Sequence, residues 1–260
     1  MKISIITATY NSEKTLRDTL DSILAQTYPD IESIIVDGAS KDGTMDIVRE
    51  YEPRFQGRMR WISEPDRGIY DAMNKGIQMA SGDVVGVLNS DDFYYDERVV
   101  EDIADAFQRK NVDCIYGNLV FIDEKDSKNI VRIWKGSQHE CGAFLRGWHP
   151  AHPTFYVKRL WFERFGGFNL KYAVSADFEL MLRFIEKGQI RNAYIDRYFV
   201  KMIMGGESTG TIRNIIKGNK NIIRALRDNG FKPSRLFLIR RLIPKAKNMI
   251  KQIIRKIIQK

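Results

Sequence analysis

Asp91 and Asp92 stand side by side in the segment Asn89-Ser90-Asp91-Asp92, directly after the apolar run 84–88. Two carboxylates this close repel one another unless a positive charge compensates them. A hard divalent cation, held by oxygen ligands and by substrate phosphates, is one such compensation. The alternative is a solvated turn, or the N-cap of the helix expected near residues 96–107. The segment alone leaves these two interpretations even.

Two further polar loops follow apolar runs that are expected to be strands. Residues 7–11 follow the first run, and residues 37–44 follow the second. Asp-Gly pairs such as Asp37-Gly38 are ordinary turn formers, so the second loop alone carries little weight. In a parallel sheet, however, the carboxyl ends of the strands meet at one rim, where ligands bind. The three loops are therefore expected to converge on one site.

Another carboxylate, Asp177, directly precedes the helical segment expected at residues 178–187. A carboxylate within hydrogen-bond reach of a hydroxyl nucleophile can remove its proton as a general base. An acid near a helix N-terminus also stabilises the first turn, and the residue pattern alone favours that structural role.

Several common enzyme motifs are absent from the chain. It contains no G-x-x-x-x-G-K-[ST], no G-x-G-x-x-G after the first strand, no H-E-x-x-H and no G-x-S-x-G. A P-loop ATPase, a standard dinucleotide oxidoreductase, a zinc metalloprotease and an α/β-hydrolase are therefore disfavoured.

The elements that must position these residues alternate along the first half of the chain. Short apolar runs predict strands at residues 3–7, 31–36, 59–63 and 84–88. Helical spacing predicts helices after Ser12, which could cap the first of them, and at residues 45–51 and 69–80. This rhythm indicates a mostly parallel sheet covered on both faces. Residues 112–123 and 130–134 predict a more antiparallel part, followed by a loop over 136–153 and helices at 160–165 and 178–187.

The net charge of +9 over 260 residues is distributed unevenly. Residues 211–260 hold 15 Lys and Arg against the single acid Asp228, so the first 210 residues are mildly acidic. Two cysteines fit a reducing compartment, and no run approaches the roughly 20 apolar residues that span a bilayer. A cytoplasmic protein is therefore expected.

The end of this basic segment has the pattern of an amphipathic helix. Apolar residues recur at helical spacing from Ala246 to Ile258, and lysines and arginines occupy much of the remaining surface. Such a helix lies in an anionic membrane interface, which we favour for residues 235–260. A helix docked on the domain and a homodimer helix are the alternatives. Nucleic acid is not expected, because the segment has few aromatic residues and no recognised binding motif.

Five ordered motifs over about residues 1–207 resemble the family 2 glycosyltransferases of the GT-A fold. The matching segments are 5–11, 36–44, 64–76, 82–92 and 166–180. The resemblance is strongest to bacterial transferases that build O-antigen, capsule or other surface polysaccharides. It implies an α/β GT-A domain over 1–210, with a donor half to about 110, an acceptor half from 111, and a basic helical extension over 211–260.

The resemblance also implies roles for individual residues. Asp177 matches the catalytic aspartate, and Asp91 matches the last aspartate of the D-x-D pattern, which binds Mn²⁺ or Mg²⁺. Asn89 replaces an aspartate that many relatives carry, which leaves Asp91 as the best single ligand, with Asp92 nearby as a further ligand, a supporting residue or a helix cap. Tyr10 would stack on uracil and Asp37 would accept its N–H. The implied donor-binding residues are Thr7, Ala8, Tyr10, Asp37, Ser40, Arg67, Asn89 and Ser90.

Two of these assignments have plain structural alternatives. Arg67 is placed to approach ribose or diphosphate, or it is a surface arginine before a helix. Trp148 and His152 match a stretch that faces the acceptor in related transferases, where Trp148 would stack on a sugar. A rigid proline-flanked loop with a structural histidine is equally consistent with the sequence.

The expected function is inverting, metal-dependent transfer of a sugar from a UDP-sugar to a lipid-linked or oligosaccharide acceptor. The expected location is the inner face of the cell membrane, where the protein is held peripherally. A sugar nucleotidyltransferase, which releases pyrophosphate, and a catalytically inactive membrane-associated scaffold of the same fold are the alternatives.

Overall fold

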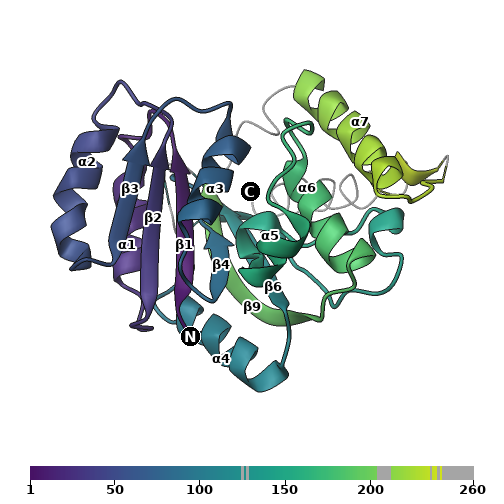
Figure 1. Cartoon of the computed structure of the whole chain (residues 1–260), viewed down its shortest axis with the longest axis horizontal. Coiled ribbons are helices and arrows are strands. Elements are labelled where there is room, and N and C mark those ends of the chain that lie inside the picture. The colour runs from purple at the N-terminus through teal and green to yellow at the C-terminus, as the bar shows by residue number, and fades with distance from the viewer. Residues whose placement is uncertain (124–125, 127–128, 204–211, 235, 239–240, 242–260) are drawn as a thin grey trace, which may run out of the picture.

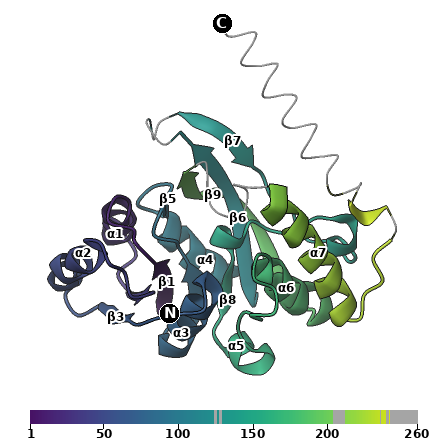
Figure 2. The same cartoon turned by 90° about the horizontal axis from the view of Figure 1, so that it is seen from above.

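A computed structural model covers the chain and describes residues 1–123, 126, 129–203, 212–234, 236–238 and 241. These residues form a central sheet with helices packed on both faces, and α7 (Ile212–Asp228) lies beside α6 (Ala176–Met181) at one side (Figures 1 and 2). The mixed α/β class expected from the sequence is confirmed. No helix in this described part has both the length and the apolar character needed to cross a membrane.

Four parallel strands make the first part of the sheet, in the order β3-β2-β1-β4. They are β1 (Ile3–Thr9), β2 (Ile31–Asp37), β3 (Met59–Ser63) and β4 (Val84–Val87). Every residue of β1, β2 and β4 is buried. The crossover helices are α1 (Leu16–Leu24), α2 (Thr44–Tyr51) and α3 (Ile69–Met79).

Alternate residues of these strands enter two separate hydrophobic clusters. Ile3 and Ile5 of β1 pack with α1 and α2, whereas Ile6 and Ala8 pack with α3. Burial on both faces explains why the strands are continuous apolar runs rather than alternating patterns. Because all four strands run parallel, their carboxyl ends share one rim.

The second part of the sheet mixes strand directions. β8 (Tyr156–Lys158) runs antiparallel between β4 and β6 (Cys114–Ile122), and β9 (Asn192–Ile203) lies parallel to β6. β7 (Ile130–Trp134) pairs with β6, and β5 (Asp92–Tyr94) pairs antiparallel with β9. The remaining elements are α4 (Val99–Lys110), α5 (Leu160–Phe165), and the short 3₁₀ turns η1 (Glu52–Phe55), η2 (Phe144–Arg146) and η3 (His152–Thr154).

Two local expectations from the sequence are wrong, and a third, a helix that is present, has other bounds and geometry than expected. Ser12 does not cap α1, which begins at Leu16 without a side-chain cap, because the Ser12 hydroxyl bonds Ser90 and the Tyr10 carbonyl instead. Asp92 is not the cap of α4, because it opens β5. The helix expected at residues 178–187 begins at Ala176 and continues after Met181 as the π-helix η4 (Leu182–Lys187).

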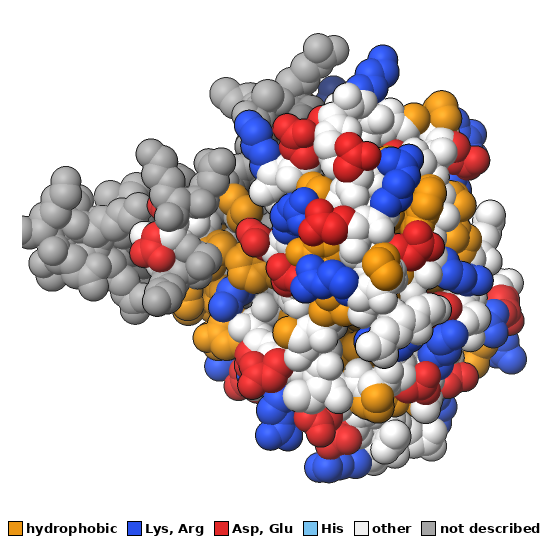
Figure 3. Space-filling view, turned by 90° about the vertical axis from the view of Figure 1, so that its left-hand side faces the viewer, with side chains coloured by type: hydrophobic (Ala, Val, Ile, Leu, Met, Phe, Trp, Pro, Cys, Tyr) orange, Lys and Arg blue, Asp and Glu red, His pale blue; other side chains and the backbone are white. Residues whose placement is uncertain are grey.

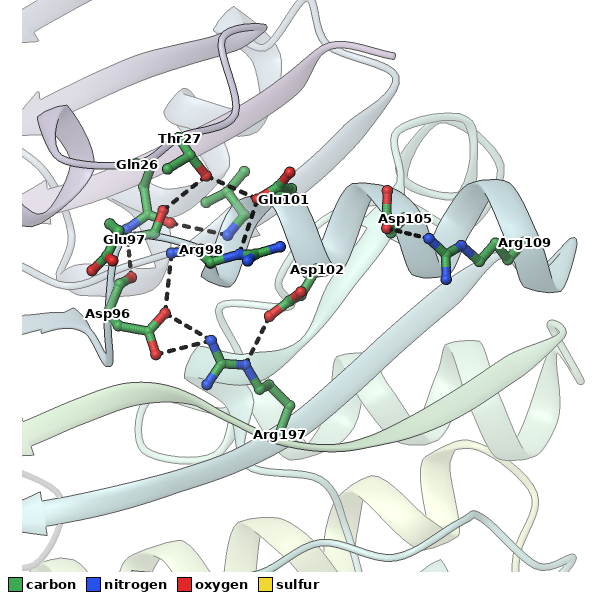
Figure 4. A network of polar contacts seen from close by, with 11 residues as sticks. Gln26, Thr27, Asp96, Glu97, Arg98, Glu101, Asp102, Asp105, Arg109 and Arg197 are labelled. Atoms are coloured by element: carbon green, nitrogen blue, oxygen red, sulfur yellow. Dashed lines mark hydrogen bonds and ion pairs between the residues drawn. The ribbon is translucent and has the colours of Figure 1, made fainter.

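A network of ion pairs between partly buried side chains joins β9 to α4 and to the loop between β5 and α4 (Figure 4). Arg197 of β9 binds Asp96 at 2.7 Å and Asp102 at 2.8 Å. Gln26, which follows α1, donates from its side-chain amide to the Asp96 carbonyl at 2.8 Å. The network therefore fixes β5, and with it the polar segment that precedes β5, against the rest of the sheet.

Candidate active site

The three polar loops that follow β1, β2 and β4 do converge, and direct hydrogen bonds join them. The Asn11 backbone N–H donates to Ser40 Oγ at 2.7 Å, which links the first loop to the second. The Ser12 and Ser90 hydroxyls lie 2.9 Å apart, which links the first loop to the third. The convergence predicted from the parallel strand order is confirmed.

The side chains expected at the nucleotide base lie on this rim in different degrees of exposure. Thr7 and Ala8 are buried within β1, whereas Tyr10 is 61% exposed. Asp37, fully buried at the end of β2, accepts hydrogen bonds from Ser40 Oγ at 2.5 Å and from Ser63 Oγ at 2.6 Å. These serines fix the orientation of the Asp37 carboxylate, while its contact with uracil stays a prediction.

Gly38 lets the second loop pass close to its neighbours. A Cβ at this position would lie 2.6 Å from Asp66 Oδ2 and 3.3 Å from Tyr10 Cδ2. Any side chain here would therefore displace Asp66, and the Asp-Gly pair has a packing reason beyond turn formation.

Arg67 lies in the loop before α3 with a side chain that is 78% exposed. Its guanidinium binds Asp71 at 3.0 Å, and its backbone N–H donates to the same carboxylate at 3.0 Å. These bonds lower the pKa of Asp71 and raise that of Arg67. Asp71 thus holds Arg67 at the edge of the rim, and a contact with ribose or diphosphate stays a prediction.

The segment 89–92 presents carboxylates whose ionisation is unfavourable in the absence of a cation. Burial raises the pKa of Asp91, and burial together with the Asp91 charge raises the pKa of Asp92 well above its usual value. Asn89 Nδ2 donates to Asp92 Oδ2 at 2.9 Å. Among the described residues, Asn89 Oδ1 and Asp92 Oδ1 are buried without a hydrogen-bond partner.

The oxygen atoms of segment 89–92 fit a divalent cation that also keeps ligands from outside the protein. No group of three or more acidic, His or Cys side chains able to hold a metal occurs in the described residues. A cation here would take a carboxylate from Asp91 and complete its shell with phosphate oxygens and water, as Mg²⁺ usually does.

A second group of side chains surrounds Asp177, which lies in the first turn of α6. The Tyr70 hydroxyl, from α3, donates to Asp177 Oδ1 at 3.1 Å. The Phe168 ring stacks on Tyr70 at 5.4 Å and meets the edge of His152 at 5.4 Å. Burial lowers the pKa of His152, and the Asp177 charge opposes that shift. Asp177 thus belongs to a group of side chains that comes from three other parts of the chain.

Trp148 has a clear packing role. Its ring meets Tyr116 at 5.8 Å and Phe144 at 5.5 Å in edge-on geometry, and lies 5.6 Å from His139. The rigid-loop alternative therefore accounts for much of this side chain, and its contact with an acceptor stays a prediction.

The residues that hold Phe168, a neighbour of the Asp177 group, in place were not expected from the sequence. Asn74 of α3 binds both backbone polar groups of Phe168, at 2.7 and 2.9 Å. A Cβ at Gly167 would lie 2.2 Å from Asn74 Oδ1, so only glycine fits. Arg183 Nη2 donates to the Gly167 carbonyl at 2.7 Å and to Glu179 at 3.0 Å. Asn74 and Gly167 both lie inside recognised motifs, but no spacing rule reveals that they meet.

The fold and these two groups define a glycosyltransferase of the GT-A type, and the comparisons agree. The model of the family "Glycosyl transferase family 2" matches residues 4–167, and the chain belongs to this family. The "PGL/p-HBAD biosynthesis glycosyltransferase" of Mycobacterium tuberculosis is 31% identical over 215 residues, which cover 82% of this chain and 79% of that protein.

Solved structures share the fold at low sequence identity. TarS of S. aureus, residues 1–349 in complex with UDP-GlcNAc, has a TM-score of 0.66 at 17% identity and covers 93% of this chain and 73% of its own. The mannosyltransferase PcManGT of Pyrobaculum calidifontis, in complex with GDP-Man and Mn²⁺, has a TM-score of 0.65 at 21% identity. The match covers 91% of this chain and 66% of PcManGT. This chain spans 44% of the longer TarS structure.

Proposed function

We propose that this family 2 glycosyltransferase transfers a sugar from a UDP-sugar, with inversion, to a hydroxyl of a lipid-linked glycan in surface polysaccharide synthesis. The observation that carries the proposal is the hydrogen bond from Tyr70 to Asp177. Tyr70 belongs to the helix that follows the Arg67 loop on the donor side, so the bond fixes the proposed base beside the donor loops.

In the proposed mechanism Asp177 is the general base of a single displacement. It accepts the proton of the acceptor hydroxyl while the hydroxyl oxygen bonds to the anomeric carbon. The bond from that carbon to the diphosphate oxygen breaks, and UDP leaves with the electron pair. Attack from the face opposite the leaving group inverts the anomeric centre, so an α-linked donor gives a β-linkage. Such a base typically contributes about 10²–10⁴-fold to the rate.

The leaving diphosphate gains negative charge as the bond breaks. A divalent cation held by Asp91 would stabilise that charge. The unpartnered oxygens of Asn89 and Asp92 support a cation at this place. PcManGT, which was solved with Mn²⁺, supports the choice of metal at the level of the fold.

UDP is the proposed nucleotide because the Asp37 carboxylate, oriented by Ser40 and Ser63, lies buried at the end of β2 and the Tyr10 ring is exposed just after β1. TarS, solved with UDP-GlcNAc, supports this choice. The lipid-linked acceptor rests on the basic segment of the sequence, whose residues 235–260 lie outside the described residues except for 236–238 and 241. We propose that this segment holds the protein at the cytoplasmic face of the membrane. The alternative is that the same segment forms a homodimer.

The test is a donor screen with UDP-Glc, UDP-Gal, UDP-GlcNAc and UDP-GalNAc against polyprenyl-diphosphate-linked sugars, in Mn²⁺ or Mg²⁺. We expect one donor to give UDP release that depends on the acceptor. Asp177→Asn should lower turnover by at least 10²-fold and retain UDP binding, because the amide cannot accept the proton.

Other outcomes assign the chain to its alternatives. Pyrophosphate release in place of UDP release indicates a nucleotidyltransferase. Absence of UDP binding by calorimetry, with metal present, indicates an inactive scaffold. Unchanged turnover in Asp177→Asn removes Asp177 as the base.

A further inference from the structure

Arg241 brings a cation from the C-terminal extension to the first turn of α6, where it lies over Phe178, the residue that follows Asp177. The residue is only 9% exposed. Its guanidinium lies 5.5 Å from the centre of the Phe178 ring, and its Nη2 lies 3.5 Å from His149 Nε2. Its backbone packs against Gly147, where an added Cβ would lie 3.0 Å from the Arg241 Cα. The side chain is therefore packed in place, more than 60 residues along the chain from Asp177.

The positive charge of Arg241 is not neutralised by a direct ion pair within the described residues. Its Nε and Nη1 atoms are buried and have no hydrogen-bond partner there. Burial lowers the pKa of Arg241 to about 10, and the charge of Asp177 opposes that shift. The guanidinium thus remains charged at neutral pH, while two of its nitrogen atoms have no hydrogen-bond acceptor among the described residues.

A buried cation whose N–H groups have no hydrogen-bond acceptor destabilises the folded state. Packing against Phe178 and Gly147 needs only an apolar side chain of similar length, so packing alone does not explain an arginine here. An anionic ligand would fill the free donors, and the planar fork of arginine matches phosphate oxygens. Arg67, the arginine expected to approach the donor, is mostly exposed and already paired with Asp71.

We propose that Arg241 binds a phosphoryl group near Asp177, and that the C-terminal extension thereby completes the active site. The inference rests on the proposed function, in which both the leaving diphosphate of the donor and a phosphate of the lipid-linked acceptor come close to Asp177. The two sources share one chemistry, and the experiment separates them.

The test compares the full-length wild type with Arg241→Met, Arg241→Lys and Arg227→Met by calorimetry in Mn²⁺. The probes are UDP, uridine, and a short-chain polyprenyl phosphate in detergent micelles. Arg227, exposed in the last turn of α7, is the matched control from the same extension. Melting temperatures of all variants are measured alongside.

If Arg241 binds the donor diphosphate, Arg241→Met weakens UDP binding tenfold or more and leaves uridine binding unchanged. If it binds an acceptor phosphate, the same loss is seen for polyprenyl phosphate and not for UDP. In either case Arg241→Lys recovers part of the affinity, because it keeps the charge without the fork, and Arg227→Met behaves as wild type.

Two outcomes overturn the inference while the proposed function stands. One is unchanged binding of every probe by Arg241→Met. The other is an equal loss for uridine and UDP with a lowered melting temperature, which marks a purely structural role. A wild type that neither binds UDP nor releases it from any donor overturns the proposed function, and the inference with it.

Discussion

In the acidic segment after β4, ionisation of the adjacent residues Asp91 and Asp92 is unfavourable. Asp92 is fully buried, and one of its oxygens has no hydrogen-bond partner among the described residues. Burial and the neighbouring Asp91 charge raise its pKa well above the usual value. The folded protein therefore binds a proton at Asp92 more tightly than the unfolded chain does, and the metal-free fold is weakened when that proton leaves.

We predict that Asp92→Asn stabilises the metal-free protein at pH 7.5. A folded-state pKa above the unfolded value gives stability below the unfolded pKa, and that stability is lost as the pH rises through the folded pKa. The neutral amide avoids this loss, so melting in EDTA should show a gain of about 1–3 kcal/mol that shrinks toward pH 4.

The control for this prediction is Asp105→Asn, which changes an exposed carboxylate on α4. It should show no comparable gain at pH 7.5. Added Mn²⁺ should raise the melting temperature of the wild type more than that of Asp92→Asn. A variant less stable than wild type at pH 7.5 in EDTA would contradict the argument.

At the residue scale, the sequence indicates candidate residues for chemistry but not the side chains that hold them in place. Asp91, Asp177 and the polar loops follow from local pattern and from family motifs. The clamp of Asn74 on Phe168 joins residues 94 positions apart, and Arg241 lies beyond the family motifs altogether. Only the packed fold brings such partners together, because no periodicity links them.

Among the elements, β5 is the short strand on which the position of the acidic segment depends. It has three residues and pairs with β9, about a hundred residues later in the chain. Arg197 of β9 reinforces this pairing through Asp96 and Asp102, as Figure 4 shows. The network connects α4 and β9 around the end of β5.

We predict that Arg197→Met lowers the free energy of unfolding by about 2 kcal/mol, since it removes charge-assisted hydrogen bonds to two partly buried carboxylates. Urea unfolding measures the change. Arg109→Met is the matched control, because Arg109 pairs with Asp105 on the exposed face of α4, and its loss should cost under about 1 kcal/mol. Equal effects of the two variants would show that the Arg197 network adds no stability.

Apolar runs and helical periodicity predict the elements of the parallel half of the fold. The four parallel strands and α1 to α3 follow directly from apolar runs and helical spacing. β5 escaped detection because three residues carry no period, and its strand geometry comes from pairing with β9. The π-helix η4 was read as ordinary helix, since apolar spacing over six residues does not distinguish the two.

Across the whole molecule, the charge is divided between a mixed surface and a basic extension. Figure 3 shows Lys and Arg interspersed with Asp and Glu on one face. Ion pairs such as Arg17–Glu50 and Arg54–Asp21 join α1 to α2 and η1. Helix α7 is packed against the domain: Ile222, Ala225 and Leu226 are buried, and Asn229 donates to Glu179 at 3.1 Å. A truncation at residue 210 would therefore expose core, and it is a poor test of membrane binding.

Charge substitution tests the membrane role without removing any element. We predict that Lys247→Gln, Lys251→Gln, Arg255→Gln and Lys256→Gln, combined in the full chain, weaken binding to anionic vesicles. Each basic residue near such a surface contributes about 1 kcal/mol, so the four together should cost on the order of a hundred- to thousandfold in partitioning.

The matched control carries four Gln substitutions at exposed arginines elsewhere, Arg49, Arg54, Arg98 and Arg109, and removes the same net charge. Co-sedimentation with vesicles containing 30% phosphatidylserine, compared with neutral vesicles, measures both variants. If the segment binds membranes specifically, only the variant with substitutions in residues 247–256 should lose vesicle binding. That variant should retain UDP binding, because Arg241 and the donor loops are unchanged. Equal losses in both variants would mean that net charge alone attracts the protein, and the extension would then be assigned to completing the active site.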